Sequence, residues 1–227
     1  MSIADLWSHE PRSSRWVGLF MARVLWNTEV VGAENVPTEG PVLLAANHTG
    51  LVDGPILHGV VPRHAHLMVK EEAFRGPVGW ALRGAGQIPV DRSGGRAALT
   101  SALALLKDGK VVGVFPEGNR GRGDATNARA GIAWLALNAG APVVPVAMLG
   151  TRRTGESVNH IPGLRRPLSV QFGRPVVIER TPGTSGRVAL LEANETIRVA
   201  LSTLVESAAA RTGLSLPTDD PNRERVI

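Results

Sequence analysis

The chain of 227 residues is long enough for one domain with a sizeable core and too short to need two. The absence of cysteine excludes thiol nucleophiles, thiolate zinc sites and disulfides, and it fits a cytoplasmic setting. A formal net charge of +5 favours anionic partners, whereas an aromatic content of 4% without tyrosine argues against nucleic acid as the partner.

The first segment, residues 1–27, mixes tryptophan with arginine. Trp16 and Trp26, with Arg15 and Arg23 among them, suit an amphipathic helix in the lipid headgroup region, because tryptophan favours that boundary and arginine favours anionic lipid. A helix that covers its own domain has the same pattern, so both interpretations stay open. Two early acidic residues argue against a secretory signal, and the longest apolar run here is about half as long as a membrane-spanning helix requires.

Strands and helices then alternate along the chain. Strands are predicted at 29–32, 42–46, 65–69, 87–90, 111–115, 142–149 and 168–172, and helices at 55–60, 72–84, 95–107, 129–138 and 185–210. This alternation predicts a single α/β domain, residues 28–212, with a central, largely parallel sheet flanked by helices and an N-terminal amphipathic helical arm at 1–27. Residues 213–227 are polar and are predicted to be a flexible C-terminal tail.

A histidine and an aspartate follow the first buried strand. Asn47 and His48 come directly after that strand, and Asp53 lies five residues beyond His48, at the start of a predicted helix. A carboxylate that accepts the proton of one ring nitrogen fixes the tautomer, so the other nitrogen can take a proton from a substrate hydroxyl. The alternative is that His48 ends the strand and Asp53 caps the helix, with no chemical role.

A second polar loop follows the strand at 111–115. Glu117-Gly118-Asn119-Arg120 and the next three residues offer two guanidinium groups and glycine backbone amides before a helix, which are the ingredients of a phosphate site. Ligands of parallel sheets gather outside the carboxyl ends of strands, where His48, Arg92 and this loop are all expected. A dinucleotide site is rejected, because the next strand lacks the acidic residue that binds ribose.

Two other histidines, His64 and His66, alternate along the strand at 65–69 and fall on one face. That spacing is one that metal sites use, but no third ligand lies nearby in the sequence. No metal site is therefore predicted.

Four ordered blocks carry a resemblance to a known family. They are Asn-His-x4-Asp at 47–53, Gly-Gln-Ile-Pro-Val-Asp-Arg at 86–92, Phe-Pro-Glu-Gly-Asn-Arg at 115–120 and Val-Pro-Val at 144–146. In this order and spacing they resemble the glycerolipid acyltransferase family, whose best-known members are the lysophosphatidate acyltransferases. The resemblance extends from about Gly32 to Gly150, which is roughly half of the chain.

The resemblance implies roles for particular residues. His48 would be the general base and Asp53 its orienting partner. The residues implied in substrate binding, mainly of the acceptor's phosphate, are Asn47, Arg92, Glu117, Gly118, Asn119, Arg120 and Arg129. Asn119 and Gly121 replace the threonine and serine that are usual in the family, and Arg129 replaces a lysine, which bears on the acceptor more than on the reaction.

The implied reaction moves a fatty acyl chain from acyl-CoA or acyl carrier protein to a glycerol hydroxyl of lysophosphatidate, making phosphatidate for phospholipid synthesis. His48 would remove the hydroxyl proton as the oxygen attacks the thioester, and neither an acyl-enzyme nor a cofactor is needed. The expected partners are these two substrates and an anionic membrane surface, with no nucleic acid. The expected location is the cytoplasmic face of a membrane, as a peripheral or monotopic protein.

Two alternatives stay open. One is an acyltransferase with another acceptor, such as glycerol-3-phosphate, a lyso-phospholipid or a glycolipid. The other is a non-catalytic lipid-binding protein at the membrane surface, which would use the basic residues but would have no use for His48 beside Asp53.

Overall fold

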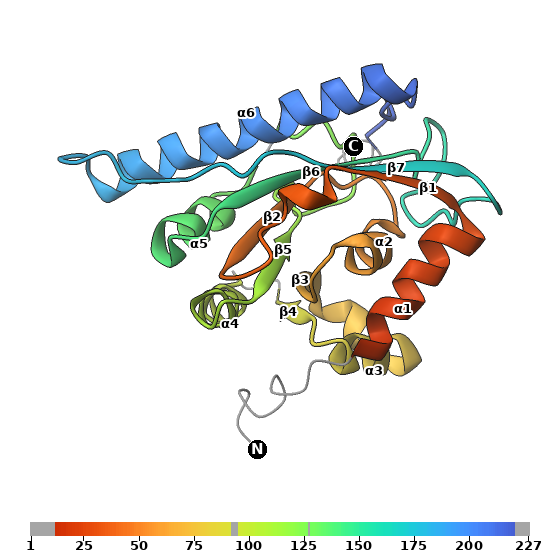
Figure 1. Cartoon of the computed structure of the whole chain (residues 1–227), viewed down its shortest axis with the longest axis horizontal. Coiled ribbons are helices and arrows are strands. Elements are labelled where there is room, and N and C mark those ends of the chain that lie inside the picture. The colour runs from red at the N-terminus through yellow and green to blue at the C-terminus, as the bar shows by residue number, and fades with distance from the viewer. Residues whose placement is uncertain (1–11, 92–94, 127, 221–227) are drawn as a thin grey trace, which may run out of the picture.

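The protein is a layered α/β domain in a computed structural model that describes residues 12–91, 95–126 and 128–220 (Figure 1). The strands are β1 (Asn27–Val31), β2 (Val42–Ala46), β3 (Ala65–Lys70), β4 (Ile88–Val90), β5 (Val111–Val114), β6 (Val143–Leu149) and β7 (Pro167–Phe172). The α-helices are α1 (Arg12–Phe20), α2 (Asp53–Val60), α3 (Gly76–Gly84), α4 (Arg96–Lys107), α5 (Gly131–Ala139) and α6 (Gly186–Thr212). Shorter turns are the π-helix η2 (Met21–Leu25) and the 3-10 helices η3 (Ala33–Asn35) and η4 (Glu71–Phe74).

The strands form one seven-stranded sheet in the order β1-β7-β6-β2-β5-β3-β4. Neighbouring strands are parallel except β6 and β7, which are antiparallel. The central strands β2 and β6 are buried along their whole length, which accounts for their uninterrupted apolar sequences. The predicted α/β fold with a largely parallel sheet is confirmed.

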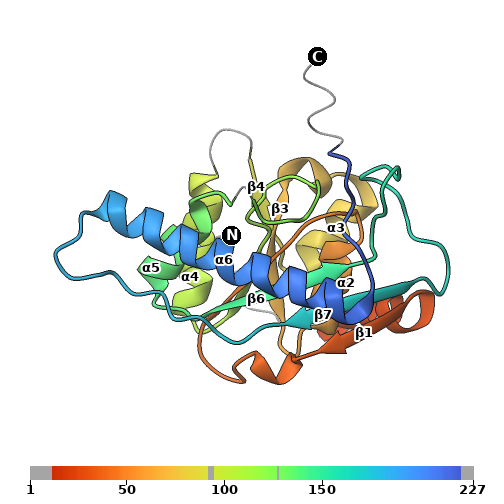
Figure 2. The same ribbon diagram turned by 90° about the horizontal axis from the view of Figure 1, so that it is seen from above.

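Alternate residues of the central strands face two separate cores. Leu44 and its neighbours two residues away contact α2 and the N-terminal helices, whereas Leu43 and Ala45 belong to the core beneath α4, α5 and α6. This period of two is what a strand buried on both faces requires. Figure 2 shows α6 lying across the sheet on the α4 and α5 side.

The N-terminal helices pack on α2 through two glycines. A Cβ atom on Gly18 would lie 2.8 Å from the backbone of Gly59, so only glycine allows the two helices to approach this closely. Trp26 is buried and its Nε1–H donates to the carbonyl of Pro162 at 2.9 Å. Trp26 therefore belongs to the core rather than to the predicted lipid-facing set, because its indole nitrogen finds a partner inside the domain.

The other part of the predicted N-terminal arm is partly exposed. Trp16 is 69% exposed on α1, and the predicted residues before Arg12 lie outside the described part of the chain. None of the helices in the described residues combines the length and the hydrophobicity needed to cross a bilayer.

The segment after α6 returns to the domain. Leu214 and Leu216 pack against a small cluster between α6 and β6, and Asp219 pairs with Arg152 after β6. Residues 214–219 of the predicted flexible tail thus make specific contacts. Their leucine side chains pack against the domain, and the Asp219 carboxylate pairs with Arg152. Residues 221–227 lie outside the described residues.

The carboxyl ends of five strands meet at one edge of the sheet. β6, β2, β5, β3 and β4 all run in the same direction. The segments that follow them therefore lie side by side although they are far apart in sequence, and this edge is where the polar loops come together.

Candidate active site

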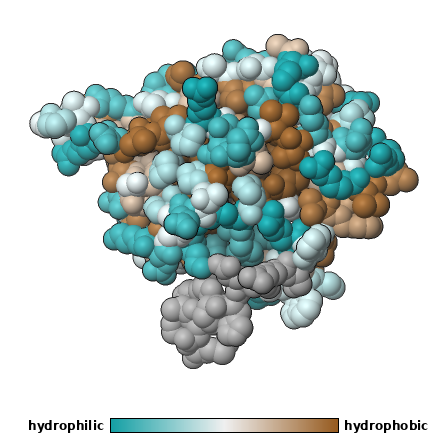
Figure 3. Space-filling model, viewed as in Figure 1, coloured by the Kyte–Doolittle hydropathy of each residue, from teal (hydrophilic) through white to brown (hydrophobic). Residues whose placement is uncertain are grey.

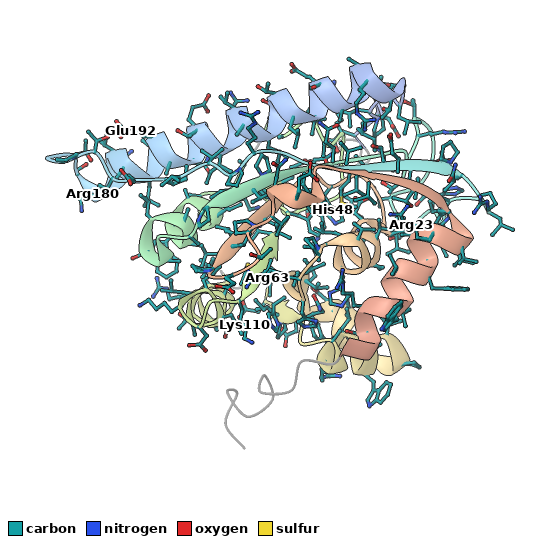
Figure 4. All side chains as sticks on the ribbon, in the orientation of Figure 1. Arg23, His48, Arg63, Lys110, Arg180 and Glu192 are labelled. Carbon is teal, nitrogen blue, oxygen red and sulfur yellow. The ribbon has the colours of Figure 1, made fainter. Side chains whose placement is uncertain are left out.

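His48 and Asp53 form a hydrogen-bonded pair at this edge. Nδ1 of His48 lies 2.8 Å from Oδ2 of Asp53, whose side chain is fully buried, whereas that of His48 is 17% exposed. His48 lies in the interior, between the sheet and α2 (Figure 4). With Nδ1–H donated to the carboxylate, Nε2 carries the lone pair that can accept a substrate proton.

The turn between β2 and α2 fixes the carboxylate. Oδ2 of Asp53 also accepts the backbone N–H groups of Thr49 at 2.8 Å and Gly50 at 2.9 Å. Asp53 is the first residue of α2, where the helix dipole favours negative charge. One short turn therefore holds both members of the pair in register.

The imidazole is held from the neighbouring strand as well. Phe115, directly after β5, stacks on the His48 ring with the two ring centroids 4.2 Å apart and the planes inclined by 22°. Glu117 Oε1 accepts the backbone N–H of His48 at 3.3 Å. Burial raises the pKa of Glu117 to about 7, against the lowering effect of that hydrogen bond. The predicted site residue Glu117 thus supports the backbone of the histidine.

Glycines allow the loop after β5 to make close contacts with its neighbours. Gly118 has φ of +70°, and a Cβ atom there would lie 2.5 Å from Nε of Arg129, so the guanidinium rests against bare backbone. The N–H of Gly121 donates to the carbonyl of His48 at 3.0 Å, and this bond holds the loop against the backbone of His48. Asn119 accepts a hydrogen bond from Nζ of Lys70, at the end of β3, at 2.6 Å.

Arg120 is oriented by a distant loop. Its Nη1 donates to the carbonyl of Val158 at 3.0 Å and to Oδ1 of Asn159 at 2.6 Å. Burial lowers the pKa of Arg120, and the charge of Asp53 opposes that change. The guanidinium therefore lies near enough to the His48–Asp53 pair for their charges to interact.

Several of these residues, among them His48 and Phe115, line one cavity of about 1040 Å³. The polar end carries His48, Lys70, Asn119, Arg120 and Arg129. The apolar lining comes mainly from α1, α2, α3, α4 and the strand ends and includes Val17, Met21, Leu51, Met68, Val78, Leu82, Leu99 and Ile132. The cavity can therefore hold a molecule with an anionic head and a long apolar chain, and His48 is part of its wall.

One predicted binding residue, Asn47, is held inside the domain, and another, Arg92, is not tested by the structure. Asn47 is fully buried, and its amide binds backbone only, donating to the carbonyls of Gly123 and Met148 and accepting the N–H of Met148. It therefore clamps β2, β6 and the loop after β5 and is not available to a substrate. Arg92 lies outside the described residues.

The structure adds two residues from outside the four blocks, Lys70 and Arg152, and a contact for a residue inside them. Lys70 brings a further cation to the cavity, and Phe115, from the third block, stacks on His48. Arg152, which follows β6, is buried and donates to the carbonyl of Gly121 at 3.1 Å. Lys70 and Arg152 could have been predicted from their positions at strand ends, because the other site residues also follow strands.

Three other histidines, His58, His64 and His66, lie close to one another. The rings of His58 and His64 are 5.2 Å apart between centroids, and those of His64 and His66 are 4.9 Å apart. Burial lowers the pKa of His58. Within the described ranges, no group of three histidine or carboxylate side chains is arranged to hold a metal ion.

Comparison with known proteins shows a consistent set of relatives. A 1-acyl-sn-glycerol-3-phosphate acyltransferase of Bacillus subtilis is 35% identical over 125 residues, covering 54% of this chain and 62% of that protein. One of Borreliella burgdorferi is 31% identical over 127 residues, covering 54% of this chain and 51% of that protein. This chain thus spans about half to three fifths of the length of these two relatives.

The fold has a solved counterpart. The 1-acyl-sn-glycerophosphate acyltransferase PlsC of Thermotoga maritima superimposes with a TM-score of 0.64 at 24% identity, covering 92% of this chain and 80% of that one. A model of the family described as Acyltransferase matches residues 27–149, which is more than half of the chain and contains the His48–Asp53 pair and the loop after β5. The chain belongs to the acyltransferase family.

Proposed function

We propose that the protein is an O-acyltransferase that transfers a fatty acyl chain from a thioester donor, acyl-CoA or acyl carrier protein, to the free hydroxyl of lysophosphatidate. The observation that carries this proposal is that His48, which is paired with Asp53, lines the same cavity as the cations Arg120 and Arg129. The names of the Bacillus and Borreliella relatives support the same acceptor class.

In the proposed mechanism, Nε2 of His48 removes the proton of the acceptor hydroxyl as the oxygen attacks the thioester carbonyl. Asp53 holds the imidazole in the required tautomer and stabilises the imidazolium that forms. The tetrahedral intermediate then expels the thiolate of the donor, and the His48 proton is released to the thiolate or to solvent. A general base in this position contributes about 100- to 10,000-fold in rate.

The cations at the polar end would bind the acceptor's phosphate. Arg120 and Arg129 offer planar guanidinium donors that match phosphate oxygens in pairs, and Lys70 adds a third charge. The glycine backbone at Gly118 lets the Arg129 guanidinium approach the loop closely. The acceptor would thus be bound by its phosphate with its glycerol hydroxyl toward His48, and the acyl chains would occupy the apolar lining.

The purified protein should convert labelled acyl-CoA and lysophosphatidate into labelled phosphatidate, separated by thin-layer chromatography. A panel of glycerol-3-phosphate, a lyso-phospholipid and a glycolipid, assayed with the same donor, tests the acceptor. Transfer to a glycolipid in preference to every phosphorylated acceptor would contradict the phosphate assignment. Vesicle binding without transfer to any acceptor would select the non-catalytic alternative.

We also propose that the protein docks on a membrane surface by α1 and α3. Both helices line the apolar part of the cavity, and both carry exposed apolar side chains, with Trp16 at 69% and Phe20 at 54% on α1 and Val78 at 62% and Trp80 at 80% on α3. Figure 3 shows hydrophobic residues gathered at the right of the molecule, beside α1. Such a surface would deliver an acyl chain from the bilayer directly into the cavity.

Sedimentation with vesicles that contain anionic phospholipid tests this docking. Trp80→Ala should reduce the bound fraction, because an exposed indole at the headgroup boundary is lost. Leu191→Ala is the matched control, since Leu191 is 63% exposed on α6, which covers the other side of the sheet. An equal loss of the vesicle-bound fraction in the two variants would contradict docking through α1 and α3.

A further inference from the structure

A short segment after α6 reaches the site loop from the far end of the chain. We name residues 214–219 the C-terminal strap. Leu214 and Leu216 pack against the cluster between α6 and β6, and the N–H of Thr218 donates to Oγ1 of Thr154 at 3.0 Å. A Cβ atom on Gly123 would lie 3.6 Å from Leu216, so the strap crosses close to the loop after β5.

At the end of the strap, Asp219 meets a buried arginine. Nη1 of Arg152 donates to both carboxylate oxygens of Asp219, at 3.0 and 2.9 Å, and Nη2 donates to the Asp219 carbonyl at 3.0 Å. Arg152 is 1% exposed. A guanidinium at this depth is stable only when it is paired and hydrogen-bonded, so the strap supplies the charge that Arg152 requires.

The same guanidinium contacts two segments, the one that carries Arg120 and the one that orients it. Nη2 of Arg152 donates to the carbonyl of Gly121, in the loop that carries Arg120. Nη1 donates at 3.0 Å to the carbonyl of Glu156, in the loop whose Asn159 accepts the hydrogen bond from Arg120. Arg152 therefore connects the segment that bears Arg120 with the segment that orients it.

The link extends to the base. Gly121 lies between two partners, since its carbonyl accepts from Arg152 and its N–H donates to the carbonyl of His48. Displacing Gly121 would shift Arg120, next to it in the chain, relative to the imidazole. A displacement of about 1 Å between reacting groups and their binding contacts costs on the order of a hundredfold in rate.

We propose that Arg152 and Asp219 are positioning residues, through which the C-terminal strap holds Arg120 and the loop after β5 in the geometry that binds the acceptor's phosphate. The proposal rests on the proposed function of the site. Neither residue contacts the acceptor, so their effect is transmitted through Gly121 and the loop at 151–160.

The kinetic test uses Asp219→Asn in the full chain. This variant should raise the Michaelis constant for lysophosphatidate about tenfold, and monoacylglycerol, which lacks the phosphate, should be affected less than twofold. Glu29→Gln is the matched control, because it removes the Arg211–Glu29 pair, which joins the end of α6 to β1 without touching the site loop. Asp219→Glu, which keeps the charge, should restore part of the loss.

Coupling to Arg120 separates positioning from a general loss of stability. In an Arg120→Ala background, Asp219→Asn should change the Michaelis constant less than twofold, because the group that it positions is gone. A full tenfold loss in that background, or equal losses with both acceptors, would overturn the proposal.

A structural readout keeps this test independent of the reaction. Hydrogen exchange of the amides in residues 117–126 and 151–160 should be faster in Asp219→Asn than in the original protein and in Glu29→Gln. Unchanged exchange in both segments would overturn the strap's role. If the original protein transfers no acyl group to any acceptor, the proposed function fails, while faster exchange would still support the strap's hold on the loop.

Discussion

The two halves of the site are built in different ways. The His48–Asp53 pair spans five residues and is fixed by one turn, whose backbone N–H groups bind the same carboxylate oxygen. Arg120 is instead held by residues 38 and 39 positions away, and the loop that carries it is braced through Arg152 by Asp219. The proposed base is thus fixed by local contacts, whereas the proposed anion site depends on tertiary contacts, and substitutions should affect the two halves differently.

The strongest expected effect comes from removing the proposed base. His48→Gln should lower kcat by about 100- to 10,000-fold, because a glutamine side chain cannot take the hydroxyl proton. The melting temperature should change little, since the turn around Asp53 keeps its backbone hydrogen bonds. Steady-state kinetics and thermal unfolding of the same preparation check both parts, and turnover near the original level would refute the assignment.

Removing the orienting carboxylate should cost somewhat less in rate but more in stability. Asp53→Asn should lower kcat by about a hundredfold, because the imidazole loses its fixed tautomer. It should also destabilise the fold by about 1–3 kcal/mol. An amide nitrogen that faces the N–H groups of Thr49 and Gly50 cannot accept their hydrogen bonds and leaves them without a partner. Denaturant titration measures the stability change, and a variant as stable as the original would show that the turn does not depend on the carboxylate.

Loss of the anion site should appear in binding rather than in chemistry. Arg120→Ala should raise the Michaelis constant for lysophosphatidate about tenfold or more with little change in kcat, since a paired charge-assisted contact to phosphate is lost. Arg198→Ala is a suitable control, because Arg198 pairs only with Glu195 on the exposed side of α6 among the described residues. A fall in kcat without a change in the Michaelis constant would assign Arg120 to the chemical step.

A last expected effect concerns stability and not activity, as a pH dependence through Glu117. Its pKa is about 7 in the folded protein against an ordinary value of 4.5, so its contribution to stability is fully present below pH 4.5 and is lost as the pH rises through 7. Glu117→Gln should therefore gain stability relative to the original protein between pH 5 and pH 8, by on the order of 2–3 kcal/mol. Denaturant unfolding at the two pH values measures it, and parallel curves would show that Glu117 titrates normally.

The features that the sequence predicted correctly are those that depend on local contacts. Strands β2, β5 and β6 were predictable because a strand buried on both faces needs an unbroken apolar run, and His48 and Asp53 because their contact depends on one turn. Trp26 was assigned to the lipid-facing set and is in the core, because a tryptophan in a helical stripe has the same pattern in either environment.

The sequence by itself determined the α/β class, the strand ends that carry the polar loops, and the spacing of the histidine and aspartate, since all three depend on neighbours within a few residues. Only the tertiary structure decided that Asn47 is a backbone clamp, that Asn159 orients Arg120, and that Asp219 balances the buried charge of Arg152. These contacts join segments 39 to 101 residues apart. The local sequence pattern does not predict such partners, because the order of strands in the sheet and the burial of charge determine which segments meet.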